Sequence, residues 1–582
     1  MTLPYDPRLY IERITSSKIY KKYAPYFPFA PNVLAVLLLS AATLYTAKEA
    51  NYQQTINSDN IIYPYLFQHF RRNDIILPGH HGNILDFPLY ILQTLLPYTY
   101  MTFSFVTIGL VVVTVALWVY LLICIFGRIY TAVICAVLAA FLFGSPGFIG
   151  SLIGNTIRNI EYPLGLAFVL AINRILRGTR ISQRLWAGLI IIFVLFSIAL
   201  AGDSLLLYCF CLPLLAAVGI YWLQSRKITI AMVQASVGVV VSVLLAEIIS
   251  SLVDKAGIVS YYYDSNFSAH TVPVSQLSFS VTTALQQALS LHGAYIFGLP
   301  QISVSQLLIF LNFALLIVAV AGFYLVLRRV IPIWRFKNIY EDNNYVLMVL
   351  AISFFLTFAV YILSDQVVHA LPGGGLAVSG QQRYISILPL LSVAGVVTVL
   401  QTYYARHRAL RMALPIVILL VSLLAVPYIR TSQNAGDAYT SSDRNTINQI
   451  IATAHQNDVS VLLTGYWYGA TSQFWSHDTV LTASVAGPSC NAAQPPFNTR
   501  KSWYTPSPSV HRSALVVDRS GPDESYWGAC SDAELKTIYG TPSKIVYLNG
   551  INQSGITQQG SVEFWVYNYD VRSRVSISPL GS

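Results

Sequence analysis

The chain has 582 residues, of which 55% are hydrophobic and only 10% are charged. This composition excludes a water-soluble globular protein, because such a protein needs polar residues over much of its surface. The formal net charge of +10 does not indicate nucleic-acid binding, because the lysines and arginines form short clusters between apolar runs and no continuous patch. We therefore expect a multi-span α-helical membrane protein that contacts membrane lipids and no nucleic acid.

The first 30 residues are basic and rich in tyrosine, and they precede an apolar run at 31–47. No small-residue cleavage site follows this run, so we interpret it as an uncleaved first span with residues 1–30 in the cytoplasm. Further apolar runs approach or exceed the length needed to cross about 30 Å of hydrocarbon. They lie near 100–126, 129–143, 162–176, 185–201, 203–223, 228–252, 304–327, 345–363, 384–404 and 412–428. The pattern predicts about eleven transmembrane helices within residues 31–428.

Alternate connections between these runs are basic, which predicts the orientation of the chain. The basic set contains Arg128; Arg174, Arg177, Arg180 and Arg184; Arg226 and Lys227; Arg328, Arg329, Arg335 and Lys337; and Arg406, Arg408 and Arg411. The opposite set is poorer in cations and consists of the loops 48–100, 144–161, 253–303 and 364–383 and a short turn at Asp203. We expect this opposite set outside the cytoplasm, and an odd number of spans puts the C-terminus there too.

Residues 429–582 contain no further apolar run and are rich in Asn, Ser, Thr, Gly and Asp. A segment of roughly 150 residues is long enough for a separate domain. A helical stretch near 445–456 precedes β-type runs at 459–463, 513–517, 544–548 and 562–567. This order predicts a C-terminal extracytoplasmic α/β domain.

The placement of the cysteines agrees with an external C-terminal domain. Cys124, Cys135, Cys209 and Cys211 lie inside apolar runs and are most simply small hydrophobic side chains. Cys490 and Cys530 are the only cysteines after residue 428, and we predict that they form a disulfide in an oxidising compartment. The alternative is a pair of buried free thiols.

Asp59, in the first long loop, is the first candidate for a catalytic residue. It follows the first span by about ten residues, and an acid where a membrane helix meets water is a functional candidate because burying a carboxylate is costly. The aromatic residues 61–72 that follow form an amphipathic segment that could lie flat at the membrane interface. The alternative role for Asp59 is to cap the start of that segment.

Two later loops carry further charged candidates. Arg158 and Glu161 lie three residues apart at the start of a span, so both could face the site that Asp59 borders; the alternative is a simple ion pair. Arg383 precedes another span, after the glycine-rich stretch 372–375. A guanidinium there suits a phosphate, which it can bind through two hydrogen bonds, and the alternative is an interfacial anchor.

The order of these motifs resembles the GT-C class of integral-membrane glycosyltransferases. The shared features are an acid in the first loop, Arg-x-x-acid-x-Pro entering a span, a late Arg-Tyr followed by Pro, and a terminal external domain. The closest similarity is to the polyprenyl-phosphate-sugar-dependent branch, which includes protein mannosyltransferases and the lipid A aminoarabinose transferase. The resemblance covers roughly the first 430 residues.

The resemblance implies roles for the charged candidates. Asp59 would be the catalytic base or its organiser, Glu161 and Arg158 would contribute to the donor and acceptor site, and Arg383 would hold the lipid-linked phosphate. Many members carry a paired acid in the first loop, whereas Asp59 is flanked by Ser58 and Asn60. No cofactor is therefore assigned, and a divalent cation stays an open alternative.

The expected reaction is inverting transfer of a sugar from a polyprenyl-phosphate donor to an extracytoplasmic glycolipid, cell-envelope polysaccharide or protein. It requires a base for the acceptor hydroxyl and cations for the leaving phosphate. It requires no nucleotide-binding loop, and no such motif is present in the sequence. Two alternatives stay open, a transporter or flippase of lipid-linked sugars and a lipid-linked polysaccharide polymerase or ligase. The expected location is a bacterial inner or plasma membrane.

Other polar and aromatic residues are weaker candidates. Those that could contact the acceptor or form a lid are Tyr63, His80, His81, Tyr262, Asp264 and His270. No metal site is assigned to His80, His81 and Asp86, because adjacent histidines do not readily reach one ion. Asp203 is expected to cap the next span. Six aromatic residues of the C-terminal domain could stack on sugars but are more simply core: Tyr466, Trp467, Tyr468, Trp475, Trp503 and Trp527.

Overall fold

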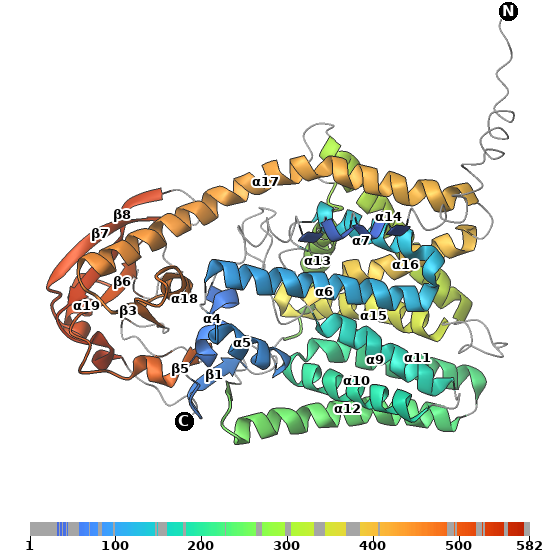
Figure 1. Ribbon diagram of the computed structural model, residues 1–582, viewed down its shortest axis with the longest axis horizontal. Helices are drawn as coiled ribbons and strands as arrows, with labels where there is room; N and C mark the ends of the chain where they lie inside the picture. Colours follow the sequence, from blue (N-terminus) through green and yellow to red (C-terminus); the bar gives the residue numbers. More distant parts are fainter. Residues whose placement is uncertain are drawn as a thin grey trace, which may run out of the picture.

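The computed structural model describes the following parts of the chain. They are residues 58–68, 70–78, 84–96, 99–145, 148, 160–177, 182–226, 228–262, 270–296, 304–330, 344–367, 384–404, 408–485, 490, 494, 498–519, 527, 530–551 and 557–575, with 32, 33, 35–37, 39–41, 43 and 44. Most of these residues are helical, and they form a helix bundle and two β-sheets (Figure 1).

The bundle confirms a helical membrane protein. Its helices are α6 (Tyr100–Phe126), α7 (Thr131–Gly144), α9 (Glu161–Leu176), α10 (Gln183–Gly202), α11 (Leu212–Ser225), α12 (Ile230–Lys255), α14 (Val304–Val330), α15 (Asn344–Leu363), α16 (Leu388–Tyr404) and α17 (Arg408–Gln456). Among the described residues, five helices are long and apolar enough to cross a membrane: α6, α10, α12, α14 and α15. Shorter apolar helices lie between them, and most of the bundle helices run along the long axis of the molecule in Figure 1.

Burial distinguishes the inner helices from the outer ones. From Ala132 to Phe143 every side chain of α7 is buried, so this helix lies in the interior of the bundle. On α12, by contrast, Val237, Val241 and Leu244 are about half exposed, with fractions of 52%, 50% and 57%. Apolar side chains on the outside of a bundle are favourable in lipid and costly in water.

One helix appears where the sequence predicted none, and one predicted span contains a π-helical turn. Within the loop 253–303, α13 (Leu277–Leu291) packs against α15, and the Tyr361 hydroxyl donates to Gln287 at 2.5 Å. Before α11, residues Leu207–Cys211 form a π-helical turn. Asp203 caps this span as predicted, because its carboxylate accepts the Leu205 N–H at 2.9 Å.

The longest helix, α17, joins two helices that were predicted to be separate. It runs without interruption from Arg408 to Gln456, so the predicted domain boundary at 428 falls inside it. The change to a polar composition after residue 428 does not end this helix, and the division into domains stays a prediction. One part of α17 packs against α7 and another against a C-terminal strand, and Figure 1 shows it leading from the bundle to the sheet.

The C-terminal part of the chain contains a five-stranded sheet with the order β4-β3-β6-β8-β7. Its strands are β3 (Val461–Thr464), β4 (Leu481–Ser484), β6 (Ser513–Asp518), β7 (Lys544–Ile551) and β8 (Thr557–Tyr567). The first three are parallel, and β8 pairs antiparallel with both β6 and β7. Helices α18 (Tyr466–Trp475) and α19 (Asp532–Tyr539) accompany this sheet, so its local fold is α/β. Four of its strands were predicted, and β4 was not.

A smaller sheet joins three distant segments of the chain. Strand β1 (Ile75–Pro78) comes from the loop 48–100, β2 (Ser260–Tyr262) from the loop 253–303, and β5 (Thr499–Arg500) from the C-terminal part. β1 pairs parallel with β2 and antiparallel with β5. A bridge between Thr271 and Ser364 adds the start of the loop 364–383. Segments that the charge pattern assigned to one side of the membrane therefore meet one another.

Candidate functional site

The structure describes only some of the predicted site residues. Arg158, His80, His81, Asp264 and Arg383 lie outside the described residues. Asp59 lies in the first turn of α4 (Ser58–Phe67), but its side chain is also outside the part that the structure describes. The geometry of the site therefore comes from the residues next to these positions and from Glu161.

Glu161 is the first residue of α9, and its side chain is fully buried. Its neighbour Tyr162 is also fully buried, and the Tyr162 hydroxyl lies 2.8 Å from the Ser386 hydroxyl, with either group able to donate. This hydrogen bond connects positions 224 residues apart in the sequence.

The Tyr162–Ser386 contact brings together two of the predicted charged motifs. Tyr162 follows Glu161 directly, and Ser386 is three residues after Arg383. The structure thus joins Tyr162, in the motif at 158–163, to Ser386, in the motif at 380–389.

Side chains that sequence analysis did not select hold the first turns of α16 in place. The indole N–H of Trp118, on α6, donates to the Leu390 carbonyl at 3.1 Å. The ring of His292, which follows α13, lies 2.9 Å from the Ser392 hydroxyl through Nε2 and 2.7 Å from the Ala288 carbonyl through Nδ1. Both side chains are fully buried. The sequence did not single them out, because Trp118 lies inside an apolar run and His292 lies in a long loop.

The sequence predicted that residues 61–72 could lie flat at the membrane interface. In the structure, helix α4, whose first turn contains Asp59, is instead packed inside the protein. Ile61, Ile62, Tyr65, Leu66 and Phe67 are all buried. They belong to one apolar cluster with side chains of α18 and the C-terminal sheet, and α4 packs against α18 and α5 (Phe87–Thr94). The prediction was wrong because the apolar surface that covers α4 comes from a part of the chain some 400 residues away.

Tyr63 was a candidate for contacting the acceptor, and it is buried within this cluster. Its exposed fraction is 8%, and its ring stacks on Tyr90 with centroids 5.2 Å apart. The ring of Phe67 packs on that of Phe87 in a tilted arrangement, with centroids 4.7 Å apart. In this structure Tyr63 therefore contributes to the packing of α4 against α5.

A buried ion pair connects the first loop to the C-terminal part. Arg500 Nε lies 2.8 Å from Asp74 Oδ2, and the two side chains are each only 7% exposed. Ser502 adds two hydrogen bonds to Asp74, from its amide and its hydroxyl, both at 2.7 Å. Burial alone would raise the pKa of the Asp74 carboxyl, but the hydrogen bonds from Ser502 and Arg500 outweigh it and hold this pKa below its usual value. Asp74 is therefore charged at neutral pH.

The loops 253–303 and 364–383 meet through backbone and carboxylate hydrogen bonds. The exposed His270 donates its amide to Asp365 Oδ1 at 3.1 Å, and its carbonyl accepts the Asp365 N–H at 2.9 Å. Tyr262 is half-buried and lies opposite Pro78 in the small sheet. Tyr262 therefore lies beside β1, and His270 links the loop 253–303 to the start of the loop 364–383.

No metal centre can be built from the residues whose placement is known. Among them, no three His, Cys, Asp or Glu side chains lie close enough together to hold an ion. Asp86 belongs to η1 (Ile84–Asp86), which packs against α10, and its carboxylate accepts the Tyr90 hydroxyl at 3.3 Å.

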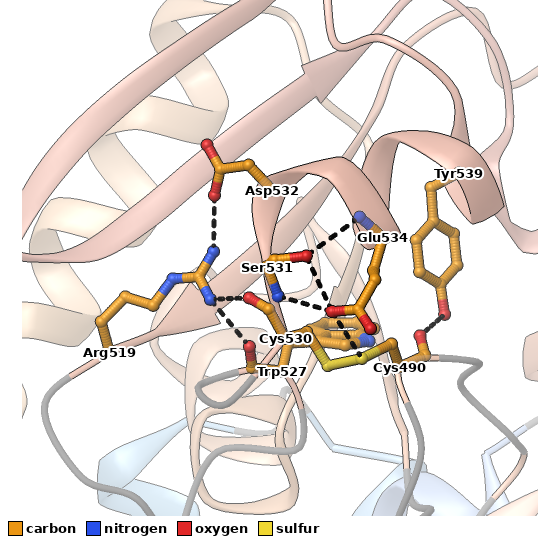
Figure 2. Close-up of a disulfide and its surroundings, with 8 residues drawn as sticks. All are labelled: Cys490, Arg519, Trp527, Cys530, Ser531, Asp532, Glu534 and Tyr539. Atoms are coloured by element: carbon orange, nitrogen blue, oxygen red, sulfur yellow. Dashed lines mark hydrogen bonds and ion pairs between the residues drawn. A yellow bond between two sulfur atoms is a disulfide. The ribbon is translucent and has the colours of Figure 1, made fainter.

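The predicted disulfide between Cys490 and Cys530 is formed (Figure 2). Around it, Arg519 donates to the carbonyls of Trp527 and Cys530 and pairs with Asp532 at 2.9 Å. Ser531 and Glu534 form a capping box at the start of α19, and the Tyr539 hydroxyl donates to the Cys490 carbonyl at 3.1 Å. A disulfide in this position fits an oxidising compartment.

The tryptophans of the C-terminal part are mainly core residues. Trp503 and Trp527 have exposed fractions of 8% and 1%. Trp475 is half-buried and links three elements: its ring lies 6.2 Å from that of Tyr100 at the start of α6, and the guanidinium of Arg444, on α17, lies 4.0 Å from it. The side chains of Tyr466 and Trp467 are outside the described residues.

Comparison with known proteins does not indicate a function for this chain. No family model matches the chain, and no curated protein matches it.

Proposed function

We propose that this chain is a membrane glycosyltransferase that moves a sugar from a polyprenyl-phosphate donor to an extracytoplasmic acceptor. In this proposal about eleven helices cross the membrane, and the C-terminal α/β part lies outside the cytoplasm. The observation that carries the proposal is the hydrogen bond between Tyr162 and Ser386. It supports a common site for Glu161, with its neighbour Arg158, and Arg383.

The proposed chemistry is a single inverting displacement. The oxygen of the acceptor hydroxyl attacks the anomeric carbon, the bond from that carbon to the phosphate oxygen breaks, and the phosphate leaves with the bonding electrons. Asp59 accepts the proton of the acceptor hydroxyl as general base. Arg158 and Arg383 stabilise the negative charge that develops on the leaving phosphate.

Contacts between the loops that were predicted to lie outside the cytoplasm support this site. The strand from the loop 48–100 pairs with one strand from the loop 253–303 and with one C-terminal strand, and a bridge between Thr271 and Ser364 joins the loop 253–303 to the loop 364–383. A donor with a lipid tail and a charged head needs a site where apolar helices end and polar loops begin. The first turns of α9 and α16, with Glu161 and the segment next to Arg383, have this character.

The direct test is sugar transfer by the purified protein from polyprenyl-phosphate sugars to candidate glycolipid, polysaccharide and protein acceptors. We expect Asp59→Asn to lower turnover by about 10²- to 10⁴-fold, because it removes the general base. Asp254→Asn is the matched control, since Asp254 is an exposed carboxylate in the last turn of α12. Wild-type turnover in Asp59→Asn, or no transfer by the wild-type protein from any of the donors, would overturn the proposal.

A further inference from the structure

We propose that Arg500 is a positioning residue that fixes helix α4 from its C-terminal end and so keeps Asp59, in the first turn, in place. This inference rests on the proposed function, because it gives the C-terminal part of the chain a role in the same site. It concerns a residue that never touches the substrate.

The guanidinium of Arg500 lies at the C-terminal end of α4. Its Nη1 donates to the carbonyls of Gln68 and of Tyr65, the latter at 3.4 Å. The last carbonyls of a helix have no partners within the helix and carry partial negative charge, so a buried cation there satisfies and stabilises them. Arg500 is thus a cap supplied from 432 residues further along the chain.

Helix α4 has reason to depend on an external cap. It has only 10 residues, so it is about 15 Å long and too short to be stable alone in water. Pro64, in its interior, has no N–H and so removes one hydrogen bond of the helix. In so short a rigid element, a shift at the Gln68 end moves the Asp59 end by a similar distance.

Arg500 is itself held rigidly. Its Nε pairs with Asp74, which also accepts two hydrogen bonds from Ser502, and its backbone lies opposite Ile75 in the small sheet. A lysine could replace the charge but not this planar set of donors, because guanidinium geometry allows one side chain to bond an acid and carbonyls together.

The C-terminal part that supplies Arg500 is in turn anchored to the bundle. Phe474 of α18 packs on Phe103 of α6 with ring centroids 6.0 Å apart, and Trp475 contacts both Tyr100 and Arg444. Helix α4 is therefore held between α18 and the Arg500 cap, and its position is set by the C-terminal part and not by the membrane helices alone.

The experiment compares Arg500→Lys with wild type by two independent measurements. Hydrogen–deuterium exchange of the peptide 61–68 reports on α4 without requiring any activity, and we expect the variant to exchange about tenfold faster there while β6 and β8 stay protected. In sugar transfer we expect kcat to fall between about ten- and a hundredfold with KM for the donor within about twofold, because misplacement of a catalytic group costs rate rather than binding.

Two further variants keep the test decisive. Arg512→Lys is the control, since Arg512 forms an exposed ion pair with Asp458 in the same region and should leave both measurements unchanged. Ser502→Ala weakens the support of Asp74 without leaving a buried charge unpaired, and we expect an intermediate increase in exchange of 61–68 even if Arg500→Lys does not fold.

The outcomes separate this inference from the proposed function. Unchanged exchange of 61–68 in both Arg500→Lys and Ser502→Ala, or an equal increase throughout the C-terminal sheet, overturns it. Faster exchange of α4 with wild-type kcat also overturns it. If the wild-type protein transfers no sugar, the proposed function fails, and with it the role of Asp59, while the exchange data still decide whether Arg500 holds α4.

Discussion

Two buried pairs of arginine and aspartate hold the polar regions outside the bundle. Arg500 and Asp74 connect the first loop to the C-terminal part, and Arg572 lies 2.7 Å from Asp570 within that part. Burial raises the pKa of Asp570, but the hydrogen bonds and charge of Arg572, with the amide of Ser507, reverse this and lower it overall. Both acids are therefore charged when folded, and removing either arginine would leave a buried carboxylate without its counter-ion.

The depressed pKa values of Asp74 and Asp570 predict how stability depends on pH. A carboxyl whose pKa is lower in the folded state contributes stability that is complete above its unfolded pKa of about 3.9 and is lost as the pH falls through the folded pKa. We expect a constant Tm in detergent between pH 8 and 5 and a fall below about pH 4. Asp74→Asn should lower the Tm at pH 7 and reduce the fall in acid. A Tm that stays constant down to pH 2 would contradict these pKa directions.

At the scale of helices and strands, α14 and α16 pack so closely that their backbones are in contact. A Cβ atom added to Gly322 on α14 would lie 2.1 Å from the Gly395 carbonyl oxygen, and one added to Gly395 on α16 would lie 2.5 Å from that of Ala319. The two helices thus touch through their backbones, as small residues permit in membrane proteins.

This contact predicts the effect of enlarging a glycine. Gly395→Ala should destabilise the protein by about 1–3 kcal/mol, because the methyl group forces α14 and α16 apart. Gly188→Ala on α10 is the control, since nothing lies within 4 Å of a Cβ there and alanine favours a helix. Thermal unfolding in detergent measures both, and an equal Tm for the two variants would contradict the tight α14–α16 contact.

The elements also show which features the sequence could predict. The apolar runs predicted α6, α10, α12, α14 and α15 within a few residues, because an uninterrupted apolar run long enough to cross a bilayer has few other interpretations. Burial of α4, the strand β5 and the continuity of α17 depend on contacts between distant parts of the chain, which local composition does not contain.

The candidate site was predictable only in part for the same reason. Glu161 was selected because an acid at the start of a span is rare, and the structure buries it beside a residue that contacts the Arg383 segment. Arg500 and Asp74 gave no local signal, since a strand-end arginine and a loop aspartate are ordinary in sequence. Their importance appears only when β1 and β5 pair.

At the scale of the whole molecule, strands β1 and β5 of the small sheet lie between the bundle and the C-terminal sheet (Figure 1). The loops 48–100 and 253–303 and the C-terminal part contribute strands to this small sheet, and a bridge joins the loop 253–303 to the start of the loop 364–383. This junction thus brings together loops that the charge pattern assigned to one side of the membrane.

The central claim is that a polyprenyl phosphate binds where the motifs at 158–163 and 380–389 meet. Photolabelling of the purified protein with a light-activated polyprenyl phosphate, followed by peptide mapping, tests it most directly. We predict label in peptides from both motifs, competed by unlabelled polyprenyl phosphate and reduced in Arg383→Gln. Label that is confined to the helix ends near Arg226 and Arg328, or that polyprenyl phosphate does not compete, would contradict the account.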